Sequence, residues 1–264
     1  MNLHVWWDEP ADGPSNMAAD ELLAAEAAAR GGMCLRLYGW TPTTVSLGGF
    51  QQSSEARAET AIAGSPLVRR PSGGGAIVHG TDLTYAAAVP KSHPWGGRPQ
   101  LFYDALHEAM RQALLGCGID VALWRPPPAV TPQAGRVRHE EFFCFSRRAT
   151  GDLVWHDAGI EGGRGHKVMG SAQRRLAATV LQHGSLLLRR NVDVAPAASH
   201  PGLADLVPEG FPATAVRPLA MRWLDGVVAA LGARLVEERG PFGDQDVVRE
   251  KAHVFASPRW TNRR

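Results

Sequence analysis

A run of three glycines within residues 69–79, Arg-Arg-Pro-Ser-Gly-Gly-Gly-Ala-Ile-Val-His, constrains this chain more than any other feature. Successive residues without a Cβ can adopt positive φ and can bring the backbone close to a ligand. Their N–H groups can converge on an anion or a carbonyl oxygen, and two arginines stand directly before them. The segments on both sides have strand patterns, and neither G-x-G-x-x-G nor G-K-[ST] is present. The stretch therefore predicts neither a dinucleotide-binding fold nor a Walker loop.

With 264 residues, 44% of them apolar and 20% charged, the chain has the composition of an ordinary globular protein with a buried core. A formal net charge of +2 gives no indication of wholesale nucleic-acid binding. No apolar run approaches the ~18 residues of a membrane span, and the first residues lack the pattern of a secretory signal. Three cysteines without a CxxC pair disfavour a disulfide framework and a zinc site. We therefore expect a cytoplasmic protein that holds no metal and binds neither nucleic acid nor membrane.

The order of helical and strand patterns indicates the fold class. Because these elements interleave without regular βαβ spacing, we expect an α+β protein. Irregular structure is predicted at 126–135 as a loop, at 159–165 as a hairpin, at 170–173 as a turn and after 238 as a polar remainder. Helices are predicted over residues 15–30, 54–63, 101–115 and 218–231. Strands are predicted at 5–7, 33–38, 43–47, 67–89 with the glycine turn inside it, 121–124, 151–155, 166–169, 179–188 and 234–238.

Cys144 is the first candidate for chemistry. It lies between phenylalanines and is followed by Arg147 and Arg148. A lone cysteine among aromatic residues is most often a buried packing residue. A neighbouring cation would instead favour its thiolate and make it a nucleophile. Cys34 and Cys117 lie in regular apolar patterns, so we assign both to packing.

Lys167 is the second candidate, because lysine is rare in this chain. Of the 28 basic residues, 25 are arginines, and the other two lysines are Lys91 and Lys251. Most lysines are solvated surface charges. A lysine used among so many arginines can also mark a place where a compact, single-point donor matters.

His79 and His183 each lie in a predicted strand beside small residues. A hydrogen-bonded structural role is the default for both, and catalysis is the alternative. No HxxxH or HxH spacing indicates a metal site. Arg69 and Arg70 could be a solvated pair, but their place before the triple glycine favours anion binding by at least one of them.

Taken together, several stretches resemble one family. Residues 69–79, followed by Asp82-Leu-Thr-Tyr85, resemble the signature of the lipoate–protein ligase and octanoyltransferase family, which shares its catalytic fold with biotin–protein ligase. Residues 16–21 resemble the family's first helix and residues 38–51 its next hairpin. Residues 167–173 and 181–186 resemble its lysine-containing segment. The resemblance runs in order from about residue 5 to 190, so the chain is identified as a member.

The resemblance implies a mixed, largely antiparallel sheet flanked by helices. It also implies one catalytic domain over 1–264, in which 191–264 form a helical and strand extension. The activity it implies is transfer of an octanoyl or lipoyl group onto a lysine of a lipoyl-domain protein. The acceptors it suggests are the glycine-cleavage H protein and the E2 subunits of 2-oxoacid dehydrogenases.

Two branches of the family differ in chemistry. Ligases activate free lipoate with ATP and Mg²⁺, whereas octanoyltransferases take octanoate from acyl carrier protein through a cysteine thioester and need no cofactor. Ser72 and the three glycines resemble the ligases, since the cysteine enzymes often have Thr-Gly-Gly-Arg there. Cys144-Phe145, eight residues before Asp152, and the segment 83–85 resemble the transferases. We favour the transferase and keep the ligase as the alternative.

In the transferase reading, Cys144 and Lys167 are catalytic. Lys167 would favour the thiolate and hydrogen-bond the acyl carbonyl oxygen, and N–H groups of 73–75 or 170–172 would complete the oxyanion site. Ala76, Val78 and Tyr85 would line an acyl tunnel, and His79 is a candidate acceptor for the amine proton. The residues expected to bind substrate are Arg69, Arg70, Ser72, Gly73, Gly74, Gly75, Ala76, His79, Tyr85, Gly170, Ser171, Ala172, His183 and Gly184.

In the ligase reading, Arg69, Arg70 and the glycine turn would hold an adenylate, and Lys167 would contact its carbonyl and phosphate oxygens. A third hypothesis is a catalytically silent binding or regulatory relative. The presence of Lys167 and of the glycine turn argues against it.

Overall fold

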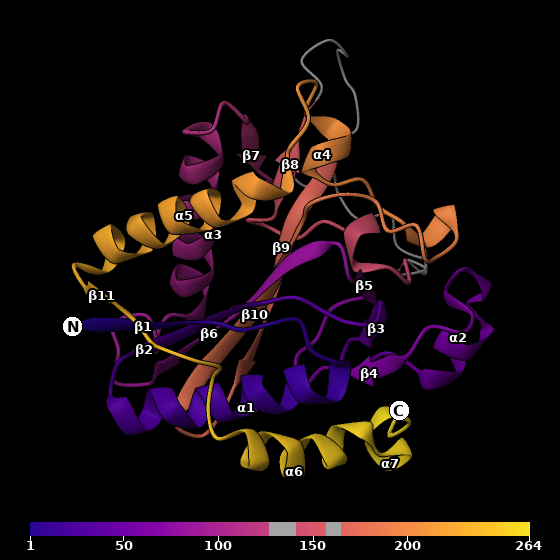
Figure 1. Cartoon of the computed structure of the whole chain (residues 1–264), viewed down its shortest axis with the longest axis horizontal. Helices are drawn as coiled ribbons and strands as arrows, with labels where there is room; N and C mark the ends of the chain where they lie inside the picture. Colours follow the sequence, from indigo (N-terminus) through magenta and orange to yellow (C-terminus); the bar gives the residue numbers. More distant parts are fainter. Residues whose placement is uncertain (127–140, 157–164) are drawn as a thin grey trace, which may run out of the picture.

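An eight-stranded sheet forms the centre of the structure, a computed structural model that describes residues 1–126, 141–156 and 165–264 (Figure 1). Within these residues the strand order is β11-β1-β2-β6-β10-β9-β8-β7. β1 pairs in parallel with β11 and β2, and the other neighbouring pairs are antiparallel. The expected α+β class, with a mixed and largely antiparallel sheet, is confirmed. The strands are β1 (Asn2–Trp7), β2 (Met33–Tyr38), β6 (Asp82–Pro90), β7 (Val121–Leu123), β8 (Leu153–Trp155), β9 (His166–Arg175), β10 (Thr179–Leu187) and β11 (Arg234–Glu237).

A small second sheet carries the glycine turn. Its central strand β3 (Thr44–Leu47) is parallel to β4 (Leu67–Arg69) and antiparallel to β5 (Ile77–His79). The predicted order of strand, glycine turn and strand over 67–89 is confirmed, but these strands belong to two different sheets. β4 and β5 lie on opposite sides of β3, so the turn crosses the end of that strand, and β6 belongs to the main sheet.

Two layers of helices cover the main sheet. α1 (Gly13–Arg30) and α6 (Gln245–Ala256) lie along one face, and α3 (Pro99–Leu115) and α5 (Val216–Leu231) along the other (Figure 1). On β6, Ala86 and Ala88 belong to the core under α1, and Ala87 and Val89 to the core under α3 and α5. This alternation is the period of two of a strand that is buried on both faces. The shorter elements are α2 (Ser53–Ala58), α4 (Leu203–Leu206), α7 (Pro258–Thr261) and 3₁₀ turns at Thr60–Ile62, Cys144–Ser146, Pro196–Ala198 and Ala213–Ala215.

Several predicted boundaries need correction. α1 begins at Gly13 because Asp12, and not Ser15 or Asn16, is its N-cap and accepts from the Ser15 N–H at 2.8 Å. The helix predicted over 54–63 ends at Ala58 and is followed by the 3₁₀ turn at Thr60–Ile62. Apart from Pro126 and Gly165, the predicted loop at 126–135 and the predicted hairpin at 159–165 lie outside the described residues.

Two larger corrections concern β9 and the C-terminal part. β9 continues through the turn predicted at 170–173 and ends only at Arg175. The predicted polar remainder after 238 contains α6 and α7. α6 has its buried residues Val248, Ala252 and Phe255 at helical spacing, and these pack on the α1 face of the sheet. None of the helices in the described ranges has the length and apolarity needed to cross a bilayer.

Candidate active site

The Cys144 backbone is joined directly to the glycine turn. Ala76 and Phe143 form an isolated parallel bridge, in which the Cys144 N–H donates to the Ala76 carbonyl at 2.8 Å and the Ala76 N–H to the Phe142 carbonyl at 2.9 Å. A Cβ on Gly75 would lie 2.8 Å from the Cys144 nitrogen and 2.8 Å from the Phe142 oxygen. Gly75 is therefore needed so that the cysteine segment can lie against the turn.

Arg70 holds the turn from inside the protein. Its guanidinium donates to the carbonyls of Gly73 and Gly75 at 3.2 and 2.8 Å, and to the backbone and side-chain oxygens of Ser46 at 2.6 Å each. Gly74, at φ +95°, supplies the left-handed residue that this turn requires. Burial lowers the pKa of Arg70 to about 10, although a Cys144 thiolate raises it. Arg70 is thus a buried cation close to the cysteine.

The N–H groups of the turn remain open. Among the described residues, no hydrogen-bond acceptor is found for the N–H groups of Gly73, Gly74 and Gly75. With their carbonyls held by Arg70, these N–H groups are available to a substrate oxygen.

Lys167 lies between a carboxylate and the cysteine. Its Nζ is 2.9 Å from Asp152 Oδ2, 3.7 Å from Cys144 Sγ and 3.4 Å from the Cys144 carbonyl oxygen. The side chain is buried, and its ammonium lies 5.2 Å from the centre of the Phe145 ring. A protonated amine in this position can stabilise a thiolate and an oxyanion beside it.

Asp152 is a site residue that the sequence reasoning used only as a landmark. It is 1% exposed, and besides Lys167 it accepts from Tyr103 Oη at 2.8 Å and from the Ala149 N–H at 2.6 Å. The sequence signal was an acidic residue placed directly before the apolar β8. Asp152 holds the Lys167 ammonium in place at 2.9 Å, with Cys144 Sγ 3.7 Å from the same nitrogen.

Gly170 makes room for the Lys167 side chain. A Cβ at this position would lie 2.4 Å from Lys167 Cε and 2.6 Å from its Nζ. Gly170 therefore does not mark a turn. It lies inside the continuous strand β9, where a glycine is needed because the Lys167 side chain folds over it.

Replacing Gly170 by alanine should displace the Lys167 ammonium and lower the rate of acylation of Cys144 by about 10- to 100-fold, because a positioned electrostatic group is lost. The rate can be followed by mass spectrometry of the enzyme after rapid mixing with an octanoyl thioester. Gly97→Ala is the control, because a Cβ there meets nothing within 4 Å. Equal rates for both variants would contradict the role given to Gly170.

A narrow and largely apolar cavity opens beside Cys144. Gly170, Ser171 and Ala172 form one side of it. Of the acyl-tunnel residues predicted from the sequence, Ala76 and Val78 line a different pocket, and Ile77 between them faces the cavity. The alternation of side chains along β5 explains this difference. The full lining is Met17, Tyr38, Trp40, Arg70, Gly74, Ile77, His79, Thr84, Cys144, Gly170, Ser171, Ala172, His183, Gly184 and Ser185.

Gly184 keeps this cavity open. A Cβ on Gly184 would lie 2.2 Å from Ser171 Oγ and 2.6 Å from Tyr85 Cε1. Tyr85 itself lies behind the lining, where its hydroxyl is 2.7 Å from Ser171 Oγ. Small residues on β9 and β10 thus keep this apolar cavity open.

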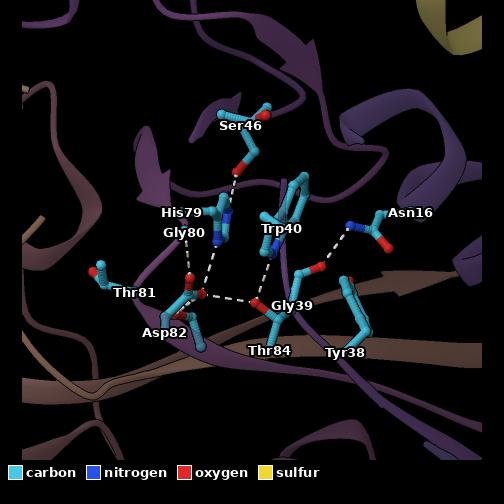
Figure 2. Close-up of polar contacts among 12 residues, drawn as sticks. Asn16, Tyr38, Gly39, Trp40, Ser46, His79, Gly80, Thr81, Asp82 and Thr84 are labelled. Carbon is cyan, nitrogen blue, oxygen red and sulfur yellow. Dashed lines mark hydrogen bonds and ion pairs between the residues drawn. The ribbon is translucent and has the colours of Figure 1, made fainter. Parts of the chain in front are cut away.

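His79 is held on all sides within the cavity wall (Figure 2). Its Nδ1 lies 2.8 Å from Asp82 Oδ2 and its Nε2 2.7 Å from Ser46 Oγ, and the ring stacks on Trp40 at 4.0 Å. Trp40 in turn donates to Thr84 Oγ1 at 2.8 Å. Burial lowers the pKa of His79 and outweighs Asp82, which raises it. With both ring nitrogens engaged, this geometry supports the structural role of His79 over proton transfer.

His183 and Ser72 meet across the cavity wall. Ser72 Oγ is hydrogen-bonded to His183 Nε2, and His183 Nδ1 lies 3.3 Å from Asp20 Oδ2. Asp20 is fully buried and also accepts from Arg36 Nη1 and Tyr38 Oη, both at 2.8 Å. The first-helix residue Asp20 is therefore the buried anchor of this side of the cavity.

Arg69 does not reach the cavity. It is fully buried, and its guanidinium donates to the carbonyls of Thr261, Gly48 and Gln51 at 2.8, 2.9 and 2.7 Å. Trp260 Nε1 donates back to the Arg69 carbonyl at 3.0 Å. The first of the two arginines thus fastens α7 and the loop after β3. Within the described ranges, no three His, Cys, Asp or Glu side chains are grouped as they would be around a metal ion.

His107 supports the cavity floor from α3. Its Nδ1 donates to the Gly151 carbonyl at 2.7 Å, so its Nε2 accepts from Ser171 Oγ at 2.7 Å. Burial lowers the pKa of His107 to about 4. The sequence signal was a histidine four residues after Tyr103 on the buried stripe of the helix.

The neutral state of His107 should make folding sensitive to acid. An unfolded histidine has a pKa of about 6.5, so this group contributes roughly 3 kcal/mol above pH 6.5, and the contribution is lost as the pH falls toward 4. His107→Gln should therefore show a smaller fall in melting temperature between pH 7 and pH 5 than the wild type. An equally steep fall in both proteins would contradict this assignment.

Comparison with known proteins identifies the relatives of this chain. The family model for the lipoyl protein ligase A/B catalytic domain matches residues 12–203. Octanoyltransferase LipM of Kyrpidia tusciae is 34% identical over 180 residues, which are 66% of this chain and 61% of that protein. Octanoyltransferase LipM of Symbiobacterium thermophilum is 36% identical over 210 residues, which are 76% of this chain and 68% of that protein. The chain spans about three fifths of the length of several such relatives, including those of Kyrpidia tusciae and Moorella thermoacetica.

Solved structures show the same fold. A crystal structure of lipoate-protein ligase A bound with ATP has a TM-score of 0.70 at 18% identity and covers 99% of both chains. The bi-partite lipoate protein ligase of Thermoplasma acidophilum also has a TM-score of 0.70, at 17% identity, and covers 99% of this chain and 96% of that one. The fold is therefore that of the lipoate–protein ligases. By sequence and by fold, the chain belongs to the lipoyl protein ligase A/B catalytic domain family.

Proposed function

We propose that this protein is an acyltransferase that moves an octanoyl or lipoyl group onto a lysine of a lipoyl-domain protein through a thioester on Cys144. The observation that carries the proposal is the placement of Cys144 Sγ 3.7 Å from Lys167 Nζ at the wall of an apolar cavity. The names of the relatives point the same way. The whole chain would act as one catalytic unit, since β11 pairs with β1 and α6 packs against α1.

In the first step, the Cys144 thiolate attacks the carbonyl carbon of the donor thioester. A bond forms between that carbon and Sγ, the bond to the donor sulfur breaks, and the donor leaves as a thiol after it takes up a proton. Lys167, held by Asp152 at 2.9 Å, stabilises both the thiolate and the oxyanion. The open N–H groups of 73–75 supply further donors beside Cys144.

In the second step, the acceptor lysine amine attacks the Cys144 thioester. The new C–N bond forms, the C–Sγ bond breaks, the amine releases its proton to solvent, and Sγ departs as a thiolate. Lys167 then stabilises the released thiolate for the next turnover. His79 is not needed for this step, since Ser46 and Asp82 engage both of its ring nitrogens.

The donor we propose is octanoyl-acyl carrier protein. The acceptors are lipoyl-domain proteins such as the glycine-cleavage H protein or a 2-oxoacid dehydrogenase E2. No cofactor is required by these steps. A thiol nucleophile suits the reducing cytoplasm, where we place the reaction.

The ligase alternative assigns Arg69 and Arg70 to phosphate oxygens. The two guanidiniums instead make seven hydrogen bonds to protein oxygens. Of their six nitrogens, Arg69 Nη2 and Arg70 Nε are the two that have no partner in the described part of the chain. This use of the two arginines favours the transferase.

The two reactions are separated by supplying the two donors to the same lipoyl domain. We expect acyl-lysine to form from octanoyl-acyl carrier protein without nucleotide, and no release of pyrophosphate from ATP with free octanoate or lipoate. If acyl transfer requires ATP and releases pyrophosphate, the protein is a ligase and the transferase proposal is wrong.

A further inference from the structure

A basic cleft of about 580 Å³ lies beside the glycine turn. Gly74 lines the cavity of Cys144, whereas Gly73 lines the cleft. Neither Cys144 nor Lys167 lines the cleft, so it is separate from the reacting atoms. Its described lining comes from four segments that are distant in sequence, contains no acidic residue and has four charged side chains, Arg174, Arg175, Arg263 and Arg264.

The four arginines of the cleft have no negative partner. Arg174 and Arg175 end β9, and Arg263 and Arg264 follow α7. Among residues 1–126, 141–156 and 165–264, no carboxylate forms an ion pair with any of the four. Burial lowers the pKa of Arg263, and the charges of Arg174 and Arg264 lower it further. Four positive charges thus converge without compensation, and such a field attracts an acidic surface.

Phe50 adds an apolar contact to the same cleft. Its side chain is 73% exposed, and it is the one aromatic residue among the exposed large apolar side chains of the described chain. The Arg264 guanidinium lies 5.5 Å from the centre of its ring, and a Cβ on Gly73 would lie 3.5 Å from the ring. An exposed aromatic ring among arginines has the composition of a protein–protein hot spot. The cleft therefore suits a protein surface better than a single ion.

The distance between the cleft and Cys144 distinguishes the two protein partners of the reaction. Lys167 folds over Gly170 next to Cys144 Sγ, and Arg174 and Arg175 lie four and five residues further along β9, at about 13 and 17 Å. A lysine side chain reaches about 6 Å from Cα to Nζ, whereas the phosphopantetheine arm of a carrier protein extends to about 18 Å. An acceptor is therefore centred on the opening at Cys144, and a donor can be centred on the cleft.

We propose that the cleft formed by Phe50 and the four arginines docks an acidic surface of the donor carrier protein while its thioester acylates Cys144. The arginines attract the carrier and accelerate its association, and Phe50 anchors it once it is bound. The attraction between the charges is weakened by salt, whereas the contact of Phe50 is not. The inference rests on the proposed function, because it names the surface that binds the donor of that reaction.

The test compares donors with and without a carrier protein. Arg174→Glu combined with Arg175→Glu should lower kcat/KM for acylation by octanoyl-acyl carrier protein about 10- to 100-fold at low salt, and most of this difference should disappear at about 0.5 M salt. Phe50→Ala should lower it about tenfold at both salt concentrations. Both variants should be acylated by octanoyl-pantetheine, which has no carrier protein, at the wild-type rate.

Arg234→Glu combined with Arg239→Glu is the matched control. It makes the same change in net charge at two exposed arginines in and directly after β11, five strands away from β9. Its kcat/KM with the carrier protein should equal that of the wild type. An equal loss in this control, or an equal loss with octanoyl-pantetheine in the cleft variants, would overturn the docking surface.

The second half of the reaction tests the choice of partner. Transfer from the isolated octanoyl-enzyme to a lipoyl domain should proceed at the wild-type rate in the variant with Arg174→Glu and Arg175→Glu. If this step slows as much as acylation or more, the assignment of the cleft to the donor is wrong. Acylation by the carrier protein at the wild-type rate in that variant would also overturn the proposal.

A binding measurement separates this inference from the transferase itself. Titration of the Cys144→Ala protein with octanoyl-acyl carrier protein at low salt, with and without the two charge reversals on β9, reports on docking without any transfer. If the wild type forms no adduct, the transferase proposal is wrong. The docking surface then stands if the charge reversals weaken the binding of the carrier about tenfold, and it is wrong if the two affinities are equal.

Discussion

Replacing Cys144 by serine should abolish both the acyl-enzyme and the transfer of octanoyl groups, with a loss of at least about a thousandfold in rate. A hydroxyl beside Lys167 remains protonated at neutral pH, and an ammonium 3.7 Å away can stabilise a thiolate but not generate an alkoxide. The measurement is the rate at which a lipoyl domain gains an octanoyl group from octanoyl-acyl carrier protein.

The chain has two other cysteines, and the exposed one provides a control for this substitution. Cys34 is buried in the core under α1, where burial raises the pKa of its thiol to about 12, and Cys117 is exposed after α3. Cys117→Ser should transfer at the wild-type rate. A Cys144→Ser variant that retains the wild-type rate would remove the thioester from the mechanism.

Lys167→Met should lower the rate of transfer by about 10²- to 10³-fold, because it removes the only ammonium next to Cys144 in the described part of the chain. It also leaves the carboxylate of Asp152 buried without its cation. Breaking such a buried pair costs roughly 3–5 kcal/mol of folding stability. A loss of activity in this variant could therefore come from misfolding alone.

A double variant separates the two effects. Asp152→Asn combined with Lys167→Met removes the unpaired charge, so the melting temperature should recover most of the loss, while the rate stays low. Recovery of the rate together with the stability would show that Lys167 acts only through folding. The single variant Asp152→Asn should lose activity as well, since Lys167 then lacks the partner that positions it.

The triple glycine shows what a sequence motif can and cannot predict. It correctly marks a turn in which glycine is required at two of the three positions, for different reasons. Gly74 has a positive φ, and Gly75 has no Cβ that would collide with the backbone of Cys144. That second reason depends on a segment about 70 residues away, and no local pattern reveals it. The close packing of the turn against the Cys144 backbone explains why this motif has glycine at position 75.

The arginines and β9 show the same limit. Arg69 looked like an anion-binding residue because of its neighbours in sequence, yet it donates to Thr261 at the far end of the chain. Gly170 was interpreted as part of a turn. A single sequence does not distinguish a glycine that makes room for a neighbouring side chain from a glycine that adopts a special backbone conformation. Asp152 could be seen in the sequence as an acidic residue before a strand. Its ion pair with Lys167 could not be predicted, because it forms only when β8 and β9 pair. Elements with their own periodicity, such as α3, were predictable, whereas contacts between distant segments were not.

One measurement tests the account most directly: the intact mass of the wild-type protein after it is mixed with octanoyl-acyl carrier protein in the absence of ATP, followed by peptide mapping. The account predicts a mass increase of one octanoyl group, located on Cys144, that disappears when a lipoyl domain is added. No adduct, or an adduct on another residue, together with ATP-dependent transfer from free octanoate, would contradict it.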